Sequence, residues 1–226
     1  MNLYALLWAV IMSSDREPKV KPDWQPQPEK FEIFPWNRNF ETGLEEIDEQ
    51  HKVLVDILNR LAWHFASDVS RVTSDHVLDE LLSYAAYHFK SEEKIWQEAL
   101  GGSDMARNHH DAHQMFFAQV QALKQDHGTE EERLSELFSY LTRWLAFHIL
   151  ESDRRMALTV KAVRSGLSLE EGREQVDSEL SGSVSVMVNA LLEIYSKLSS
   201  LTVQLLQEKM ARHRAEAELD RLQRRR

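Results

Sequence analysis

The strongest restriction on how this chain folds is a set of apolar stripes that also carry histidines. Between residues 44 and 148, apolar residues recur every three or four positions, which is typical of the buried face of an α-helix. The first two stripes contain Leu44, Ile47, His51, Leu54, Leu58, Leu61 and Phe65, and then Leu78, Leu81, Ala85, His88, Glu92, Ile95 and Ala99. The last two contain Ala106, His109, His113, Phe116, Val120 and Leu123, and then Leu134, Leu137, Leu141, Trp144 and His148.

Short polar or glycine-containing breaks separate these four segments. They are residues 67–74, Gly101-Gly102 and His127-Gly128. The chain has only 7 Gly and 5 Pro, too few for a turn-rich β-sandwich. We therefore expect an all-α fold, an up-down-up-down four-helix bundle.

The stripes carry five histidines and one glutamate into the core of that bundle. An isolated histidine on an apolar face is usually a core residue with a hydrogen-bond partner. Burying six polar groups without partners, however, costs about 2–7 kcal/mol for each group. His88 and Glu92, like His109 and His113, are four residues apart and so lie on one helix face. A metal centre satisfies all of these groups together.

The donor set narrows the choice of metal. Five imidazoles with carboxylates are too many ligands for one tetrahedral zinc and too rich in nitrogen for calcium or magnesium. The chain has no cysteine, which excludes disulfides, thiolate metal sites and thiol catalysis. Two iron or manganese ions fit best.

A carboxylate such as Glu92 can bridge two cations, and a second bridging carboxylate is expected from the fourth segment. On a straight helix Glu151 would face the core better than Asp153, which is turned about 140° from His148. The apolar stripe resumes in phase with Asp153, however, because Met156, Val160 and Val163 follow it. We therefore predict a phase slip such as a π-bulge after His148, with Asp153 as the ligand.

These residues stand in an ordered series of motifs that resembles the bacterial hemerythrins. The resemblance covers residues 31 to about 157. Its motifs are Pro35-Trp36, Phe40-Glu41-Thr42-Gly43, Ile47-Asp48-Glu49-Gln50-His51-Lys52, His88-Phe89-Lys90-Ser91-Glu92-Glu93, His109 to His113, and Trp144-Leu145-Ala146-Phe147-His148-Ile149 with Asp153. Trp96 and Gly101-Gly102-Ser103 depart from the family pattern, which has a methionine and an aromatic-proline turn there.

The resemblance implies a non-haem di-iron centre that binds O2 as its ligand. By it, one iron would be held by His109, His113 and His148, and the other by His51 and His88. Glu92 and Asp153 would bridge the two irons, together with an oxo or hydroxo group. The O2 pocket would be lined by Trp144, Leu145 and Ile149. The remaining histidines of the bundle region, His64, His76, His110 and His127, are expected to be solvated.

The N-terminal region reads as a tail. Residues 1–30 are expected to be extended or disordered, and translation is expected to begin at Met12, with a short membrane-touching anchor as the alternative. The apolar run from Leu3 to Met12 is too short to span a membrane and lacks a signal-peptide pattern. The net charge of −10 argues against nucleic-acid binding. We expect a cytoplasmic protein.

The C-terminal region carries a heptad pattern. Residues 31–158 would form the bundle, residues 159–182 a helix extension and polar linker, and residues 183–226 a coiled-coil helix. All but two core-type positions are apolar in the series Val184, Met187, Leu191, Ile194, Leu198, Leu201, Leu205, Glu208, Arg212, Ala215, Leu219 and Leu222. We expect a parallel homodimer; a fifth helix packed on the bundle is the alternative.

Three functions are compatible with this reading. The first is an oxygen or redox sensor that signals through its coiled coil to a separate protein, since the chain contains no output-domain motif. The second is oxygen storage, delivery or scavenging. The third is an enzyme that reduces nitric oxide or peroxide at the same centre. We favour the sensor, a non-enzymatic role, because storage does not require a long coiled coil.

Overall fold

The computed structural model describes residues 34, 36, 38–66, 71–125 and 130–180, and a discontinuous set of residues between 191 and 222. Its elements are η1 (Arg38–Phe40), α2 (Glu45–Ala66), α3 (Arg71–Leu100), α4 (Asp104–Gln125), α5 (Glu130–Phe147), η2 (His148–Asp153), α6 (Arg154–Arg164) and α7 (Leu169–Leu180). The described residues form helices and connections without a strand, so the predicted all-α class is confirmed.

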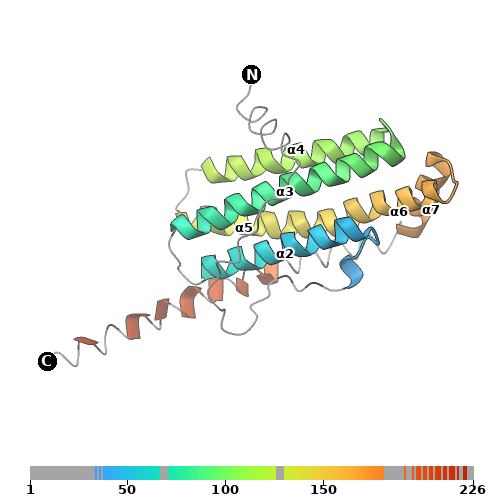
Figure 1. Ribbon diagram of the computed structural model, residues 1–226. Coiled ribbons are helices and arrows are strands. Elements are labelled where there is room, and N and C mark those ends of the chain that lie inside the picture. The colour runs from blue at the N-terminus through green and yellow to red at the C-terminus, as the bar shows by residue number, and fades with distance from the viewer. Residues whose placement is uncertain are drawn as a thin grey trace, which may run out of the picture.

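Four long helices form a bundle. Helices α2, α3, α4 and α5 lie alongside one another, with contacts from α2 to α3, α3 to α4, α4 to α5 and α5 back to α2 (Figure 1). Each helix turns its stripe inward, and Leu54, Leu81, Phe116 and Leu141 meet in one apolar core. The predicted up-down-up-down bundle is therefore confirmed.

A hydrogen-bonded loop positions the start of α2. The Asp48 carboxylate accepts hydrogen bonds from the backbone N–H of Thr42 at 2.6 Å and of Gly43 at 2.9 Å. Gly43 has a φ of +75°, and a Cβ there would collide with Lys161 Nζ. Lys161 on α6 donates to the Thr42 carbonyl at 2.7 Å. This loop therefore ties the beginning of α2 to α6, and it requires glycine at position 43.

The predicted phase slip is present. Residues His148–Asp153 form a π-helix between α5 and α6, so the helix gains one residue in a single turn. As a result Asp153 is fully buried, while the Glu151 side chain accepts hydrogen bonds from Arg155. Beyond the slip, Met156 and Val160 pack with Trp96 in a second apolar cluster.

Part of the predicted linker is a helix. Residues 169–180 form α7, which packs against α6. Ser168 and Glu171 form a capping box, in which the Ser168 N–H donates to Glu171 Oε2 at 2.9 Å and the Glu171 N–H donates to Ser168 Oγ at 3.3 Å. Gly172 permits the close approach, since a Cβ there would lie 3.2 Å from that of Ala162. The capping box was the sequence signal for this helix.

Every described residue between 191 and 222 is helical, and this segment runs away from the bundle (Figure 1). Its large apolar side chains are exposed: Leu191, Leu198, Leu201, Leu205 and Leu222. Near the start of the segment, the Tyr195 ring packs edge-on against Phe34 with ring centroids 5.4 Å apart. A coiled coil of two chains stays a prediction.

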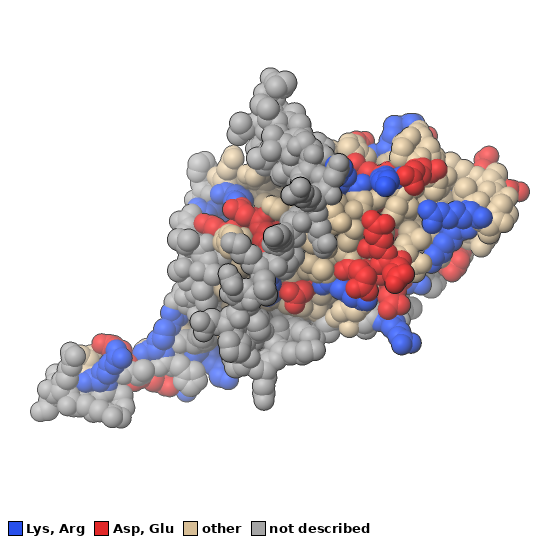
Figure 2. All heavy atoms as spheres, viewed as in Figure 1, with Lys and Arg blue, Asp and Glu red and all other residues tan. Residues whose placement is uncertain are grey.

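Two further features bear on the sequence expectations. Basic and acidic side chains are interspersed over the face of the molecule drawn in Figure 2. Among the described helices, none has the length and apolar character needed to cross a membrane. The expectations for residues 1–30 and for a start at Met12 lie outside the described residues.

Candidate metal centre

Four helices bring seven polar side chains to one point inside the bundle. His51 comes from α2, His88 and Glu92 from α3, His109 and His113 from α4, and His148 and Asp153 from the two ends of the π-helix. None of the seven is more than 6% exposed. The four apolar stripes and the phase slip after His148 bring them together. These are the seven residues named from the sequence as metal ligands.

The side chains form two groups that could each hold a cation. One group is Glu92, His109, His113 and His148, and the other is His51, His88, Glu92 and Asp153; within each group the ligand atoms lie within 4.8 Å of one another. Glu92 belongs to both groups. Its Oε2 lies 3.3 Å from His113 Nε2 and 3.6 Å from His88 Nε2.

The Asp153 carboxylate faces both groups with different oxygens. Its Oδ2 lies 3.1 Å from His51 Nε2. Its Oδ1 lies 3.1 Å from His148 Nε2 and 3.3 Å from His109 Nε2. Such an arrangement suits a carboxylate that bridges two cations with one oxygen on each.

Several of these buried atoms have no hydrogen-bond partner among the described residues. They are both ring nitrogens of His51, His88 Nε2, Glu92 Oε1 and both carboxylate oxygens of Asp153. An unpaired buried carboxylate is among the most costly arrangements in a protein, so these atoms require a ligand. Nitrogen and carboxylate donors in this number fit a pair of transition-metal ions, iron or manganese, better than one zinc or calcium.

Burial sets the charge of the donors. Desolvation lowers the pKa of His88, His113 and His148 well below the usual value, which keeps these imidazoles neutral. Burial and the nearby Asp153 carboxylate raise the pKa of Glu92 well above its usual value. The centre thus offers neutral imidazole lone pairs beside two carboxylates that repel each other unless a cation lies between them.

Two further side chains fix the orientation of the imidazoles. His88 Nδ1 donates to Gln50 Oε1 at 3.0 Å, and His113 Nδ1 donates to Glu93 Oε1 at 3.1 Å. In both rings the proton therefore sits on Nδ1 and the Nε2 lone pair points to the centre. Gln50 and Glu93 were not among the predicted site residues, although Gln50 directly precedes His51 and Glu93 directly follows Glu92.

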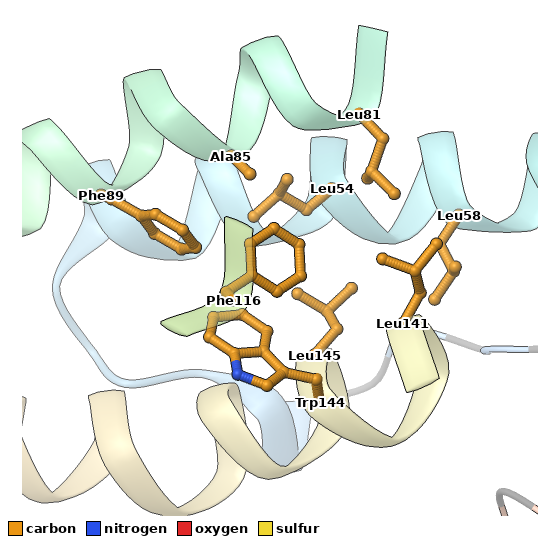
Figure 3. Close-up of a pocket in the computed structure, with 9 residues that line it drawn as sticks. All are labelled: Leu54, Leu58, Leu81, Ala85, Phe89, Phe116, Leu141, Trp144 and Leu145. Atoms are coloured by element: carbon orange, nitrogen blue, oxygen red, sulfur yellow. The ribbon is translucent and has the colours of Figure 1, made fainter. Parts of the chain in front are cut away.

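An apolar cavity of about 10 Å³ lies next to the centre, lined by Leu54, Leu58, Leu81, Ala85, Phe89, Phe116, Leu141, Trp144 and Leu145 (Figure 3). Phe89 stacks on His113 at 3.8 Å, and Trp144 stacks on His148 at 4.1 Å, both between ring centroids. Trp144 and Leu145 are two of the three predicted pocket residues. The third, Ile149, is buried in the same core but does not line this cavity.

A second and larger cavity, of about 280 Å³, lies on another side of the centre and is lined by both polar and apolar residues. It is bordered by His109 and by residues of α4, α6 and α7, among them Asn108, Arg155 and Asp177. Trp96, the departure from the family pattern, contacts His109 edge-on at 6.0 Å between ring centroids. The indole thus joins the second apolar cluster to His109.

The other histidines only partly match the expectation of solvated side chains. His76 is exposed, as predicted. His64 is half-buried, and burial lowers its pKa. His110 shares the Glu93 carboxylate with His113, at 2.9 Å from Oε1, and its side chain is 44% exposed. His127 lies outside the described residues.

Comparisons with known proteins agree with this geometry. Residues 42–158 match the Hemerythrin HHE cation binding domain. The chain is 32% identical over 131 residues to a bacteriohemerythrin from Stenotrophomonas maltophilia, and the match covers 58% of this chain and 83% of that protein. It is 33% identical over 134 residues to a Pseudomonas aeruginosa bacteriohemerythrin, covering 59% and 83%.

A hemerythrin-like protein from Naegleria gruberi is 31% identical over 122 residues, which cover 54% of this chain and 89% of that protein. No solved structure gives a significant match. The family model leaves residues 159–226 of this chain outside the matched domain.

Proposed function

This chain belongs to the hemerythrin family, and from that premise we propose that it is a non-haem di-iron protein that binds O2. The observation that carries this proposal is the set of buried, unpartnered donor atoms arranged in two groups that share Glu92. We assign His109, His113 and His148 to one iron, His51 and His88 to the other, and Glu92 and Asp153 to both. The oxo or hydroxo bridge stays a prediction.

The residues around the centre favour binding of a small apolar ligand over water. When bound, the iron pair supplies electrons and an open coordination position for O2. Trp144 and Leu145 line a cavity without polar groups, and its volume is close to that of one water-sized molecule. Water would find no hydrogen-bond partner there. Gln50 and Glu93 hold the imidazoles in place, so the donors need little reorganisation when a ligand enters.

We infer a binding protein rather than an enzyme from the donor set. Imidazoles that bind a metal are neutral, so five imidazoles and two carboxylates would give the irons less negative charge than a carboxylate-rich set. Less anionic ligand charge stabilises highly oxidised iron less, which favours reversible binding. Oxygen storage, delivery or scavenging, and reduction of nitric oxide or peroxide, are the competing functions.

We further infer a sensor that signals through its C-terminal helix as a homodimer, with a separate partner protein downstream. Asp153 ends the π-helix, and α6 begins at the next residue, so a change at the centre reaches α6 directly. Arg155 then links Glu151 of the π-helix to Asp177 of α7. A cytoplasmic location stays a prediction.

Absorption spectra of protein purified without oxygen, with metal analysis, test the central proposal. We expect about two irons per chain, a colourless reduced form, and a charge-transfer band that appears with air and disappears when oxygen is removed. A protein without iron, or one that is oxidised by air without forming a reversible band, would contradict it. Multiple turnovers with nitric oxide would favour the reductase.

The sensor proposal has its own test. The association state of the chain, and its binding to proteins from the source cell, are measured in the reduced and in the oxidised form. If both are the same in the two forms, the centre does not signal through the helix.

A further inference from the structure

The C-terminal helix contacts the rest of the chain with one face and leaves its described leucines exposed. Ser199 is only 4% exposed, whereas the preceding Leu198 is 61% exposed. Tyr195, one turn before Ser199, packs on Phe34, and burial raises the pKa of Tyr195 to about 12. Folding against the bundle would normally bury the leucine and expose the serine. The exposed apolar face of this helix, which we call the seam and which includes Leu198, Leu201, Leu205 and Leu222, is therefore directed to a different partner.

The seam contains two charged residues at core positions of the heptad pattern. Glu208 and Arg212 are four residues apart, and both are helical and exposed. In a parallel homodimer every core residue faces its own counterpart. Glu208 would then face Glu208 and Arg212 would face Arg212, so two successive layers would bring like charges together.

An antiparallel pair removes both repulsions. If Glu208 of one copy faces Arg212 of the other, the same register places Leu205 opposite Ala215 and Leu198 opposite Leu222. Leu201 then falls opposite position 219, which is also a leucine in the sequence. Every pair joins the two kinds of core position, the arrangement of an antiparallel coiled coil, and charges become complementary in two symmetric layers.

We propose that the partner of this seam is a second copy of the chain in antiparallel orientation, centred between Glu208 and Arg212. This inference rests on the proposed homodimer and replaces the parallel arrangement expected from the sequence. The overlap runs from about residue 194 to the end of the chain, about 50 Å of helix. It places the two bundles at opposite ends of the coiled coil.

Introduced cysteines distinguish the two orientations, because the natural chain has none. Leu198→Cys and Leu222→Cys chains with tags of different size are oxidised separately and as a mixture. The antiparallel dimer predicts a disulfide between the two variants in the mixture and little linkage of either variant alone. Linkage of each variant with itself would show a parallel dimer, and no linkage at all would show that the seam does not pair; both overturn the proposal.

Charge exchange provides an independent readout. Glu208→Arg faces Arg212 twice in the antiparallel dimer, and we expect a rise of at least tenfold in the dimer Kd measured by analytical ultracentrifugation. Adding Arg212→Glu to the same chain should restore the affinity. In a parallel dimer neither change alters the like-charge layers, so an unchanged Kd for Glu208→Arg overturns the proposal.

Two controls keep the result specific. Arg212 also donates to Glu216 of its own helix at 2.9 Å, so the exchange at Glu208 is the cleaner single variant. Iron content and the air-dependent spectrum are measured on every variant. If the cysteine pairs form while the chain holds no iron, the antiparallel seam stands and the proposed function fails. If the chain holds iron but the two cysteine variants do not link, the proposed function stands and the antiparallel seam fails.

Discussion

The interior of the bundle and the C-terminal helix break the usual distribution of side chains in opposite ways. The bundle buries polar groups, with His51, Glu92 and Asp153 fully excluded from solvent. The terminal helix exposes apolar groups, with Leu198 and Leu205 more than half exposed. Each arrangement is costly in an isolated chain. Both departures agree with the proposals made above, in which ions occupy the interior and a second copy of the chain covers the exposed leucines.

The largest effect is expected when the carboxylate shared by the two groups is removed. Glu92→Ala takes a donor from both groups, and we expect the variant to lose its iron during gel filtration, measured by metal analysis. Glu98→Ala, an exposed site on the same helix, is the matched control and should retain iron. Dimer formation should be unchanged in both variants. Retention of a full iron complement by Glu92→Ala would refute the assignment of Glu92 as a bridge.

Removal of the metal should destabilise the bundle and leave the terminal helix paired. A ligand present at 1,000 times its Kd stabilises the folded state by about 4 kcal/mol. We therefore expect a chelator to lower the free energy of unfolding by about that amount, measured by urea denaturation followed by tryptophan fluorescence. The dimer Kd, measured in parallel, should stay constant. A denaturation curve that the chelator does not shift would mean that the buried donors do not need a cation.

Acid should also destabilise the bundle rather than the terminal helix. Burial lowers the pKa of His88, His113 and His148 from an ordinary value of 6.5. Below that pH the unfolded chain binds more protons than the folded one. Stability is therefore full above about pH 6.5 and falls as the pH is lowered, by about 1.4 kcal/mol per pH unit for each proton. Protons also compete with the metal for the imidazoles.

Thermal unfolding between pH 8 and pH 5, with and without iron, checks this prediction. The midpoint should drop steeply below about pH 6.5 in both forms, and iron should be released over the same range. A flat profile would show that the histidines are protonated in the folded bundle.

The smallest effect on the bundle is expected from a leucine of the terminal helix. Leu205→Ala should change the free energy of unfolding of the bundle by less than about 0.5 kcal/mol, because Leu205 is 64% exposed. Leu141→Ala, the matched change at a residue only 2% exposed, should cost about 2–5 kcal/mol. Dimer formation should be weakened more by Leu205→Ala than by Leu141→Ala. Equal effects of the two variants on the bundle would mean that Leu205 is buried in the protomer.

The meeting of the candidate ligands was predictable because six of the seven belong to stripes with helical spacing. Even the π-helix followed from the sequence, since Met156 and Val160 are in phase with Asp153 and out of phase with His148. The outer contacts were not predictable in the same way. Gln50 and Glu93 lie beside the stripes, so their contact with a ligand depends on how neighbouring helices are rotated.

Helix α7 was missed for a different reason. Its sequence is polar and contains Gly172, a combination that usually marks a linker. Only Val176 and Gly172 are buried on it, so it has little apolar periodicity of its own. The small residue stabilises the helix through close packing on Ala162, and this depends on tertiary structure. The local signal, the capping box of Ser168 and Glu171, predicts where the helix begins but not that it persists.

The π-helix has a consequence for how this chain can change in length. It contains one residue more than an α-helical turn, and a residue lost from it would rotate all that follows by about 100°. The loss would turn Asp153 away from His51 and Lys161 away from Thr42 at once. Insertions and deletions in related chains should therefore be absent between His148 and Asp153. They should gather between the ends of successive described helices, such as between Ala66 and Arg71 or between Gln125 and Glu130.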